Sequence, residues 1–159
     1  MALSSKKISV VKATQKDMPE VAKLSIEMLK YHNALFDDYF TIFPYEEYVE
    51  KFKQKLKDKH FILVAKADGK VVGFLSAEFK KTPWYKNANV CLIEEVAVCK
   101  MCRSCGVGTA LFDELLSVCK GKGIEEIKLD VYNINERAKR LYERLGFKDL
   151  RQQMSLTLK

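Results

Sequence analysis

The feature that most constrains this chain is an apolar segment followed by a glycine-containing turn and an amphipathic segment, all within residues 90–120. Residues 90–98 are mostly apolar, which predicts a strand in the interior of a sheet. Residues 107–120 place apolar side chains at helical spacing, which predicts a helix with one buried face. A strand, a glycine turn and a helix N-terminus in this order form a common binding site for an anion.

Similar patterns predict the elements around this unit. Strands are expected at 8–11, 61–66, 70–80, 127–132 and 151–158, and helices from 18, over 44–57 and over 136–145. The pair Asp68-Gly69 predicts a hairpin between two of the strands. The order predicts one α/β domain over residues 1–159, with a mixed sheet of about six to seven strands flanked by about four helices.

Charge and composition narrow the class of partner. The net charge of +7 fits a partner that carries phosphates, which includes nucleic acid, an anionic membrane and a phosphorylated cofactor. The basic residues are scattered, and the lysine-rich run at 51–59 is typical of a solvated helix face. No apolar run is long enough to span a membrane, and the start of the chain does not resemble a signal peptide. We therefore expect a cytoplasmic protein with no nucleic-acid or membrane partner and with free cysteine thiols.

A cysteine triplet precedes the glycine turn and suggests two kinds of site. Cys99, Cys102 and Cys105 have the spacing C-x2-C-x2-C, which is found in metal and iron–sulfur sites. Both kinds of site need a fourth ligand. The next cysteine is Cys119, on the expected inner face of a helix, and the two histidines lie far away in the sequence. We therefore predict no metal site here.

The alternative is a phosphate site made by the same loop. Gly106 and Gly108 allow a sharp turn and a close approach of the backbone to a ligand. The helix that follows offers unpaired N–H groups, and Arg103 adds a positive charge. The two common nucleotide fingerprints, the P-loop and the dinucleotide-binding glycine motif, are not found in this chain.

Two motifs resemble those of a known family. The first is Arg-x-x-Gly-x-Gly at 103–108, directly after the strand, and the second is Asn-x-x-Ala-x-x-x-Tyr-x-x-x-Gly-Phe at 135–147. Together they closely resemble the GNAT superfamily of acyl-CoA-dependent N-acetyltransferases, and in detail the diamine and polyamine acetyltransferases. The resemblance covers the whole order of elements, whereas its specific motifs occupy about residues 92–147.

The resemblance implies that acetyl-CoA is the cosubstrate. Its pyrophosphate would lie on the loop amides, and its pantetheine arm would run beside the strand as an additional strand. The residues implied in contact with it are Val96, Ala97, Val98, Arg103, Ser104, Cys105, Gly106, Val107, Gly108, Thr109, Asn135 and Ala138. From its position alone, Asn135 is also a candidate N-cap of the last helix.

The resemblance also implies catalytic side chains, for which there are three candidates. Glu94 and Glu95 lie on an otherwise apolar strand, where a carboxylate needs a partner or a role, and one of them would take the proton of the amine. Strict alternation would put them on opposite faces of the sheet, and a bulge would change this, so both remain candidates, with Glu94 favoured. Tyr142 would donate to the departing thiolate. A backbone N–H near Val96 or Ala97 would stabilise the oxyanion.

The acceptor is harder to predict. Asp37 and Asp38, with Tyr39, Tyr45 and Trp84 in neighbouring loops, would suit a cationic amine, although such a stretch is also typical of a polar turn. We expect a small-molecule amine as acceptor, and the chain to be a possible homodimer. Acetylation of a protein N-terminus or lysine, and acyl-CoA binding without catalysis, are the alternatives.

Overall fold

The structure is a computed structural model, and it describes residues 7–36, 38–58 and 60–158. Its strands are β1 (Ile8–Lys12), β2 (Phe61–Ala67), β3 (Lys70–Lys81), β4 (Asn89–Val98) and β5 (Glu126–Leu129). Its helices are α1 (Met18–Leu35), α2 (Tyr45–Lys57), α3 (Val107–Gly121) and α4 (Glu136–Arg144), with short 3-10 helices at Gln15–Asp17 and Lys100–Cys102. Within the described residues, no helix is both long and apolar enough to cross a membrane.

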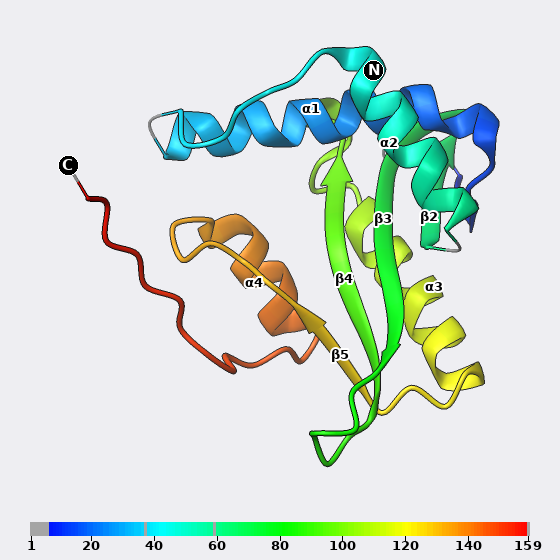
Figure 1. The fold of residues 1–159 in the computed structure, drawn as a ribbon. Helices are drawn as coiled ribbons and strands as arrows, with labels where there is room; N and C mark the ends of the chain where they lie inside the picture. The colour runs from blue at the N-terminus through cyan, green and yellow to red at the C-terminus, as the bar shows by residue number, and fades with distance from the viewer. Residues whose placement is uncertain (1–6, 37, 59, 159) are drawn as a thin grey trace.

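The strands form one mixed sheet in the order β1-β2-β3-β4-β5 (Figure 1). Neighbours from β1 to β4 are antiparallel, and β5 is parallel to β4. The predicted α/β class, the four helices and the meander followed by a β-α-β unit are confirmed. The predicted count of six to seven strands is wrong, because the sheet has five and residues 148–158 form no strand.

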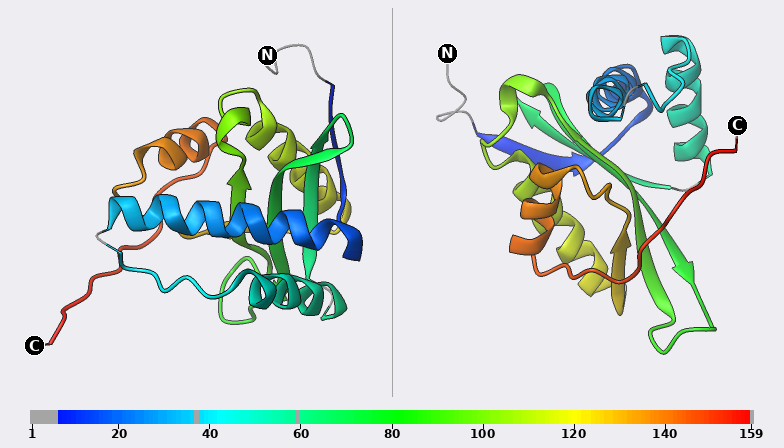
Figure 2. Two further views of the ribbon diagram at one scale, coloured as in Figure 1. Left: turned by 90° about the horizontal axis from the view of Figure 1, so that it is seen from above. Right: turned by 90° about the vertical axis from the view of Figure 1, so that its left-hand side faces the viewer.

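Helices cover both faces of the sheet and create two apolar cores. α3 packs on one face, where Leu75, Ile93 and Leu111 are buried together. α1 and α2 pack on the other face, around Phe52 and Phe74 (Figures 1 and 2). The two cores explain why β2 and residues 71–77 of β3 are apolar at nearly every position, since side chains that point either way are buried there.

Two glycines are needed for this packing and for the tight turn. A Cβ at Gly73 of β3 would lie 2.8 Å from Cγ1 of Val107 and 3.1 Å from the carbonyl oxygen of Ala97, so only glycine lets α3 approach so closely. Asp68 and Gly69 have φ values of 51° and 76°, as the predicted two-residue hairpin requires. The turn sets β3 beside β2, and Gly73 lets the start of α3 lie close to β3 and β4.

Candidate active site

The loop between β4 and α3 exposes backbone amides at a helix N-terminus. Ser104 and Gly106 have positive φ values of 63° and 79°, and Gly106 is the N-cap of α3. The first backbone bond of the helix runs from the Ala110 amide to the Gly106 carbonyl, at 2.9 Å. The amides of Val107, Gly108 and Thr109 therefore have no acceptor within the helix, and an anion can bind them.

Two arginines lie beside this loop, and only one was predicted. The guanidinium of Arg103 lies 5.1 Å from the centre of the Tyr31 ring, and its Nε donates to the Val98 carbonyl at 3.2 Å. Arg137, in the first turn of α4, donates to the Ser104 hydroxyl at 3.3 Å. Arg103 thus connects the loop to α1 through Tyr31, whereas Arg137 adds a second positive charge near the exposed amides. The sequence could have indicated Arg137, because this residue lies two positions after Asn135 in the second motif.

The cysteine triplet does not act as three equivalent thiols. Cys99 and Cys102 form a disulfide, with their Cα atoms 5.3 Å apart, so the expectation of free thiols is wrong for these two. The short 3-10 helix brings them together, because the Cys102 amide donates to the Cys99 carbonyl at 2.9 Å. Cys105 remains free, as do the buried Cys91 and Cys119. The first turn after β4 is therefore closed covalently, directly before the exposed amides.

A β-bulge places Glu94 and Glu95 on the same face of the sheet. The register between β3 and β4 shifts where Ser76 pairs with Glu95 and Ala77 pairs with Ile93, so Glu94 is the extra residue. Strict alternation would have separated the two carboxylates, and the bulge brings both toward α1 and α2. The sequence alone left open whether the two side chains share a face of the sheet, and the register shift shows that they do.

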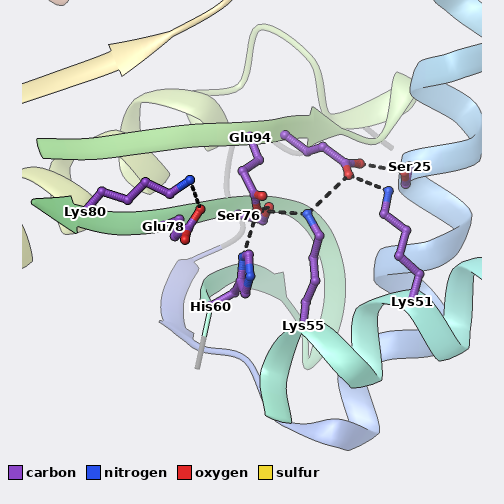
Figure 3. A network of polar contacts seen from close by, with 9 residues as sticks. Ser25, Lys51, Lys55, His60, Ser76, Glu78, Lys80 and Glu94 are labelled. Carbon is purple, nitrogen blue, oxygen red and sulfur yellow. Dashed lines mark hydrogen bonds and ion pairs between the residues drawn. The ribbon is translucent and has the colours of Figure 1, made fainter. Parts of the chain in front are cut away.

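Both carboxylates accept from donors that come from distant parts of the chain (Figure 3). Glu94 accepts from Lys55 at 2.8 Å and Ser76 at 3.0 Å, and lies 3.2 Å from Nδ1 of His60. Burial acts to raise the pKa of Glu94, but the bond and charge of Lys55, with Ser76 and His60, outweigh it and hold the pKa below its ordinary value. Glu94 is therefore ionised at neutral pH.

Glu95 accepts from donors on the two helices, and Lys55, which binds Glu94, also lies 3.9 Å from Oε1 of Glu95. Glu95 accepts from Ser25 of α1 at 2.7 Å and from Lys51 of α2 at 2.8 Å. Lys51 and Lys55 are one helical turn apart, so they point toward the same face. The lysine run that we expected to be a solvated helix face therefore supplies both counter-charges, and the side chain of Lys55 is only 17% exposed.

Two hollows border this network of carboxylates and lysines. One has a volume of about 330 Å³ and is lined by His60, Phe61 and Phe79 among others. The other, of about 150 Å³, is lined by Phe43, Glu47, Tyr48 and Lys51. His60, Glu78 and Glu94 come close enough to hold a metal ion. Lys80 and Lys55, however, already neutralise the two carboxylates, which accounts for the cluster without a metal.

Tyr142 of α4 packs against two other aromatic rings. Its ring centre lies 5.8 Å from that of Phe112 and 5.9 Å from that of Phe147. Burial raises the pKa of Tyr142 to about 12, so the hydroxyl keeps its proton at neutral pH. The ring thus belongs to the core on the α3 face, as the apolar stripe of this helix suggested, and the hydroxyl remains a potential donor.

The start of α4 is fixed by Asn135, as its position predicted. Its side-chain oxygen accepts from the Ala138 amide at 3.2 Å, which is an N-cap bond. Its amide nitrogen lies 3.5 Å from Nε2 of His32 on α1. Asn135 therefore joins the last helix to the first.

The comparison with known proteins identifies the family. Residues 28–147 match the model described as the Acetyltransferase (GNAT) family. The chain belongs to the GNAT family. This match covers the carboxylate pair, the amide loop and α4, which are the parts of the site described above.

Relatives of this GNAT chain carry acetyltransferase names. It is 31% identical over 118 residues to the N-alpha-acetyltransferase of Sulfurisphaera tokodaii, which covers 69% of this chain and 67% of that protein. It is 33% identical over 88 residues to the probable N-acetyltransferase camello of Xenopus tropicalis, which covers 55% of this chain. The matched segment spans only 38% of the length of that camello protein.

Solved structures share the same fold. A mutant of the BH1408 protein from Bacillus halodurans has a TM-score of 0.86 and 26% identity, covering 95% of this chain and 99% of that chain. Aminoglycoside N-acetyltransferase AAC(6')-Iy in complex with CoA has a TM-score of 0.74 at 17% identity, covering 98% and 97% of the two chains. At that identity, the second likeness concerns the fold alone.

The residues of this GNAT domain fit a CoA molecule in two respects. A Cβ built at Gly106 meets nothing within 4 Å, so the backbone at the N-cap of α3 is open on that side. β5 pairs with β4 only as far as Ile93, so the backbone edge of β4 from Glu94 to Val98 has no strand beside it on that side among the described residues. An extended arm with amide groups can occupy that edge as a strand would.

The predicted acceptor residues do not come together. Tyr39 packs with Phe36 and Phe40 at the end of α1, whereas Trp84 lies in the β3–β4 hairpin and is 92% exposed. Figure 1 shows this hairpin at the far end of the sheet from α1 and α2. Tyr39 and Trp84 therefore do not line one acceptor pocket. The Tyr45 hydroxyl donates to the Pro19 carbonyl at 3.3 Å.

The remaining acceptor candidates give a mixed result. Asp38 lies in the turn after α1 with a φ of 59°, as the polar-turn alternative expected, and Asp37 lies outside the described residues. The aromatic group at this end includes His32 and Tyr132, which the sequence did not single out. Burial lowers the pKa of His32, so its ring is neutral at physiological pH.

Proposed function

We propose that this GNAT domain transfers an acetyl group from acetyl-CoA to a primary amine by direct attack in a ternary complex. The observation that carries the proposal is the β4 bulge. It presents Glu94 and Glu95 together, a few residues before a loop whose amides suit a pyrophosphate. The carboxylates proposed to accept a proton and the amides proposed to hold the phosphates thus lie along one strand and the loop that follows it.

The cofactor would be held mainly by backbone groups. The amides of residues 104–109 would bind the pyrophosphate, with Arg137 and Arg103 beside them. Val96, Ala97 and Val98 would bind the pantetheine arm along their unpaired edge, and Asn135 and Ala138 would border it. The thioester of acetyl-CoA supplies the activated acetyl group. An N–H of Val96 or Ala97 would donate to the carbonyl oxygen as negative charge develops there.

Glu94 is our candidate for the proton acceptor. An alkyl ammonium group has a pKa near 10.4, so it must lose a proton before its nitrogen can attack. The side chain of Glu94 is 28% exposed against 13% for Glu95, so an acceptor reaches Glu94 more easily. Because its pKa is lowered, Glu94 is a weak base, and His60 or a water molecule would relay the proton. Glu95 would orient α1 and α2 through Ser25 and Lys51.

Tyr142 is our candidate for the donor to the leaving sulfur. A hydroxyl with a pKa of about 12 does not give up its proton fully to a thiolate whose pKa is near 8.5. It would instead donate a hydrogen bond that strengthens as charge develops on sulfur. This role is compatible with the packing of its ring against Phe112 and Phe147.

For the acceptor we propose a small-molecule amine. Aminoglycoside acetyltransferases share the fold, one of them in complex with sisomicin, and these proteins act on amines of small molecules. The name of the Sulfurisphaera tokodaii relative favours a second candidate, the α-amino group of a protein. We further propose that residues 1–159 form one domain that acts in the cytoplasm without a nucleic-acid or membrane partner.

The test is an acetyl-CoA turnover screen that measures release of free CoA thiol. Diamines, aminoglycosides, amino acids and short peptides with free N-termini form the panel, and N-acetylated peptides serve as controls. Turnover with one of the free amines is expected. Binding of acetyl-CoA without turnover on any amine would instead support a non-catalytic acyl-CoA module, and no binding would refute the proposal.

A further inference from the structure

The pair Cys99–Cys102 takes no part in the acetyl transfer proposed above. These two cysteines form a disulfide, whereas Cys91, Cys105 and Cys119 are free. Burial raises the pKa of Cys91 and of Cys119, so their thiols stay protonated and unreactive. The paired cysteines have the spacing C-x2-C, which in thiol–disulfide oxidoreductases lets a pair alternate between disulfide and dithiol. Thiol–disulfide exchange is therefore the chemistry open to this pair.

The fold does not depend on this disulfide for its stability. Two apolar cores already hold the sheet between its helices. The disulfide joins residues only three positions apart, and the stabilisation by a cross-link falls as the closed loop becomes shorter. In the cytoplasm, where we propose that this protein acts, disulfides are usually transient and either catalytic or redox-sensing. We therefore expect reduction to leave the fold intact and to act locally.

The local effect falls on the amide loop. The Cys99 amide donates to the Val72 carbonyl of β3 at 2.9 Å, which fixes the first cysteine to the sheet. The disulfide fixes Cys102 to Cys99, and Arg103, which contacts α1 through Tyr31, follows directly. The next residue, Ser104, has a φ of 63°, a conformation that residues other than glycine rarely adopt. The disulfide thus fixes the point from which the left-handed turn of the loop begins.

The two sulfur atoms differ in how easily a reagent reaches them. Cys102 is buried, with 4% of its surface exposed, whereas Cys99 is only partly buried. Lys100 and Met101 between them are exposed, so the turn lies at the surface. An attacking thiolate therefore reaches Cys99 first, and Cys102 is the leaving group.

From these observations we infer that Cys99 and Cys102 form a reversible thiol–disulfide site, which orders the amide loop when oxidised and loosens it when reduced. The exchange partner is a vicinal dithiol. One of its thiolates attacks the Cys99 sulfur and breaks the bond to Cys102, which leaves as a thiolate and takes up a proton. The second thiolate attacks the mixed disulfide, so Cys99 is released and protonated and the partner leaves as a disulfide. Two electrons and two protons pass to the protein, and the reverse sequence restores its disulfide.

The first test follows the cysteines and the loop without any ligand. Wild-type protein is equilibrated with mixtures of reduced and oxidised dithiothreitol, then denatured in acid, alkylated and analysed by mass spectrometry. Three cysteines should be alkylated in the oxidised form and all five in the reduced form. Hydrogen exchange of the amides of residues 103–109 should be about fivefold faster in the reduced form, because the loop opens locally more often. The amides of β2 and β3 should exchange at the same rate in both forms.

The second test measures acetyl-CoA affinity by calorimetry, a readout that rests on the proposed function. Reduction should raise the dissociation constant about fivefold, as for a loop that holds its binding form about one-fifth of the time. Cys99→Ser should match the reduced form with or without dithiothreitol. The matched control Met101→Ser changes an exposed residue of the same turn, keeps both cysteines and should still respond to reduction.

Three results would overturn the inference. One is a disulfide that dithiothreitol does not reduce in the folded protein, and another is equal exchange of the loop amides in the two forms. The third is equal affinity of the two forms in a protein that binds acetyl-CoA. If neither form binds acetyl-CoA, the proposed function fails, and hydrogen exchange alone decides on the redox site. If Cys99→Ser does not fold, chemical reduction of the wild-type protein provides the same comparison.

Discussion

The amide loop and the carboxylate pair occupy neighbouring parts of the chain, but different kinds of contact build them. The loop depends on nearby residues: Ser104 and Gly106 supply its turns, and the Cys99–Cys102 disulfide closes the segment before it. The carboxylates depend on distant ones: the partners of Glu94 and Glu95 come from α1, α2, β3 and the segment before β2. A phosphate site can thus be made locally, whereas a pair of adjacent, partly buried carboxylates needs donors from the whole fold.

The difference has an electrostatic cause. Backbone amides at a helix start carry a fixed partial charge and need no counter-ion. Two carboxylates on a partly buried strand repel each other and lose hydration, so each needs a cation or several donors. Lys51 and Lys55 fulfil this need from one face of α2. Changes near the carboxylates should therefore alter chemistry and pH dependence, and changes in the loop should alter cofactor affinity.

The largest effect is expected for Glu94→Gln. The change removes the proton acceptor and keeps the shape of the side chain, so kcat/KM should fall by about 100-fold, the low end for general base catalysis. Steady-state kinetics with the best amine from the screen measures this. Glu95→Gln is the matched control and should lose less. A greater loss for Glu95→Gln would exchange the roles of the two residues.

The pH profile sharpens the same prediction. Lys55 is a main cause of the lowered pKa of Glu94, so Lys55→Met should raise that pKa and move the acid limb of the activity to higher pH. The Glu94–Lys55 pair also makes stability depend on pH. Its contribution to the free energy of unfolding is fully present above the ordinary pKa of Glu94 and is lost as the pH falls through the lowered pKa. Lys51→Met serves as the control at the Glu95 pair, and an unchanged acid limb in Lys55→Met would contradict the assignment.

The same contrast explains what the sequence predicted well. The strand–turn–helix unit, the Asp68-Gly69 hairpin and the Asn135 cap follow from residues a few positions apart, and the structure confirms all three. The bulge at Glu94 was considered but not decided, because it depends on how β3 and β4 pair. The roles of Lys51 and Lys55 were missed, since a lysine run on a helix looks the same in solvent or over a strand that carries acids.

Two other errors also have a physical origin. The segment 151–158 has a strand pattern, but a pattern does not provide a neighbouring strand, and the structure shows none for it. The acceptor residues were grouped by chemical type, although Trp84 lies in the β3–β4 hairpin and Tyr39 packs against Phe36 and Phe40 after α1. In both cases the sequence pattern carries no information on which parts of the chain lie next to one another in space.

The second-largest effect is expected for Tyr142→Phe, in the core on the α3 face. A hydrogen bond to a charged group contributes about 1.5–2 kcal/mol, so kcat should fall by about 10–30-fold while acetyl-CoA affinity changes little. Kinetics, calorimetry and the melting temperature measure the three quantities. Phe147→Leu, which removes a neighbouring ring without touching the hydroxyl, is the control for packing. A kcat within about twofold of wild type would leave Tyr142 a packing residue only.

A smaller effect is expected in the loop, for Gly108→Glu. The carboxylate would lie among the amides proposed to hold the pyrophosphate, so acetyl-CoA affinity should fall about tenfold, or about 1.4 kcal/mol. A Cβ at this position lies 3.2 Å from Cδ2 of Leu141, so part of any loss could come from packing against α4. Gly108→Ala carries the same Cβ without the charge and isolates that part. Equal affinities for the two variants in calorimetry would place the phosphates elsewhere.

The smallest effect is expected for Asn135, where a local and a distant contact meet in one side chain. Its oxygen caps α4 at the Ala138 amide, and its nitrogen faces His32. Asn135→Ala removes both contacts and should lower the free energy of unfolding by about 1 kcal/mol, the usual value of an N-cap. Asn135→Asp keeps the cap acceptor and removes only the donor to His32, so chemical denaturation should find it close to wild type. If Asn135→Asp loses as much as Asn135→Ala, the contact with α1 rather than the cap stabilises the start of α4. The last helix would then depend on long-range contacts, as the carboxylates do.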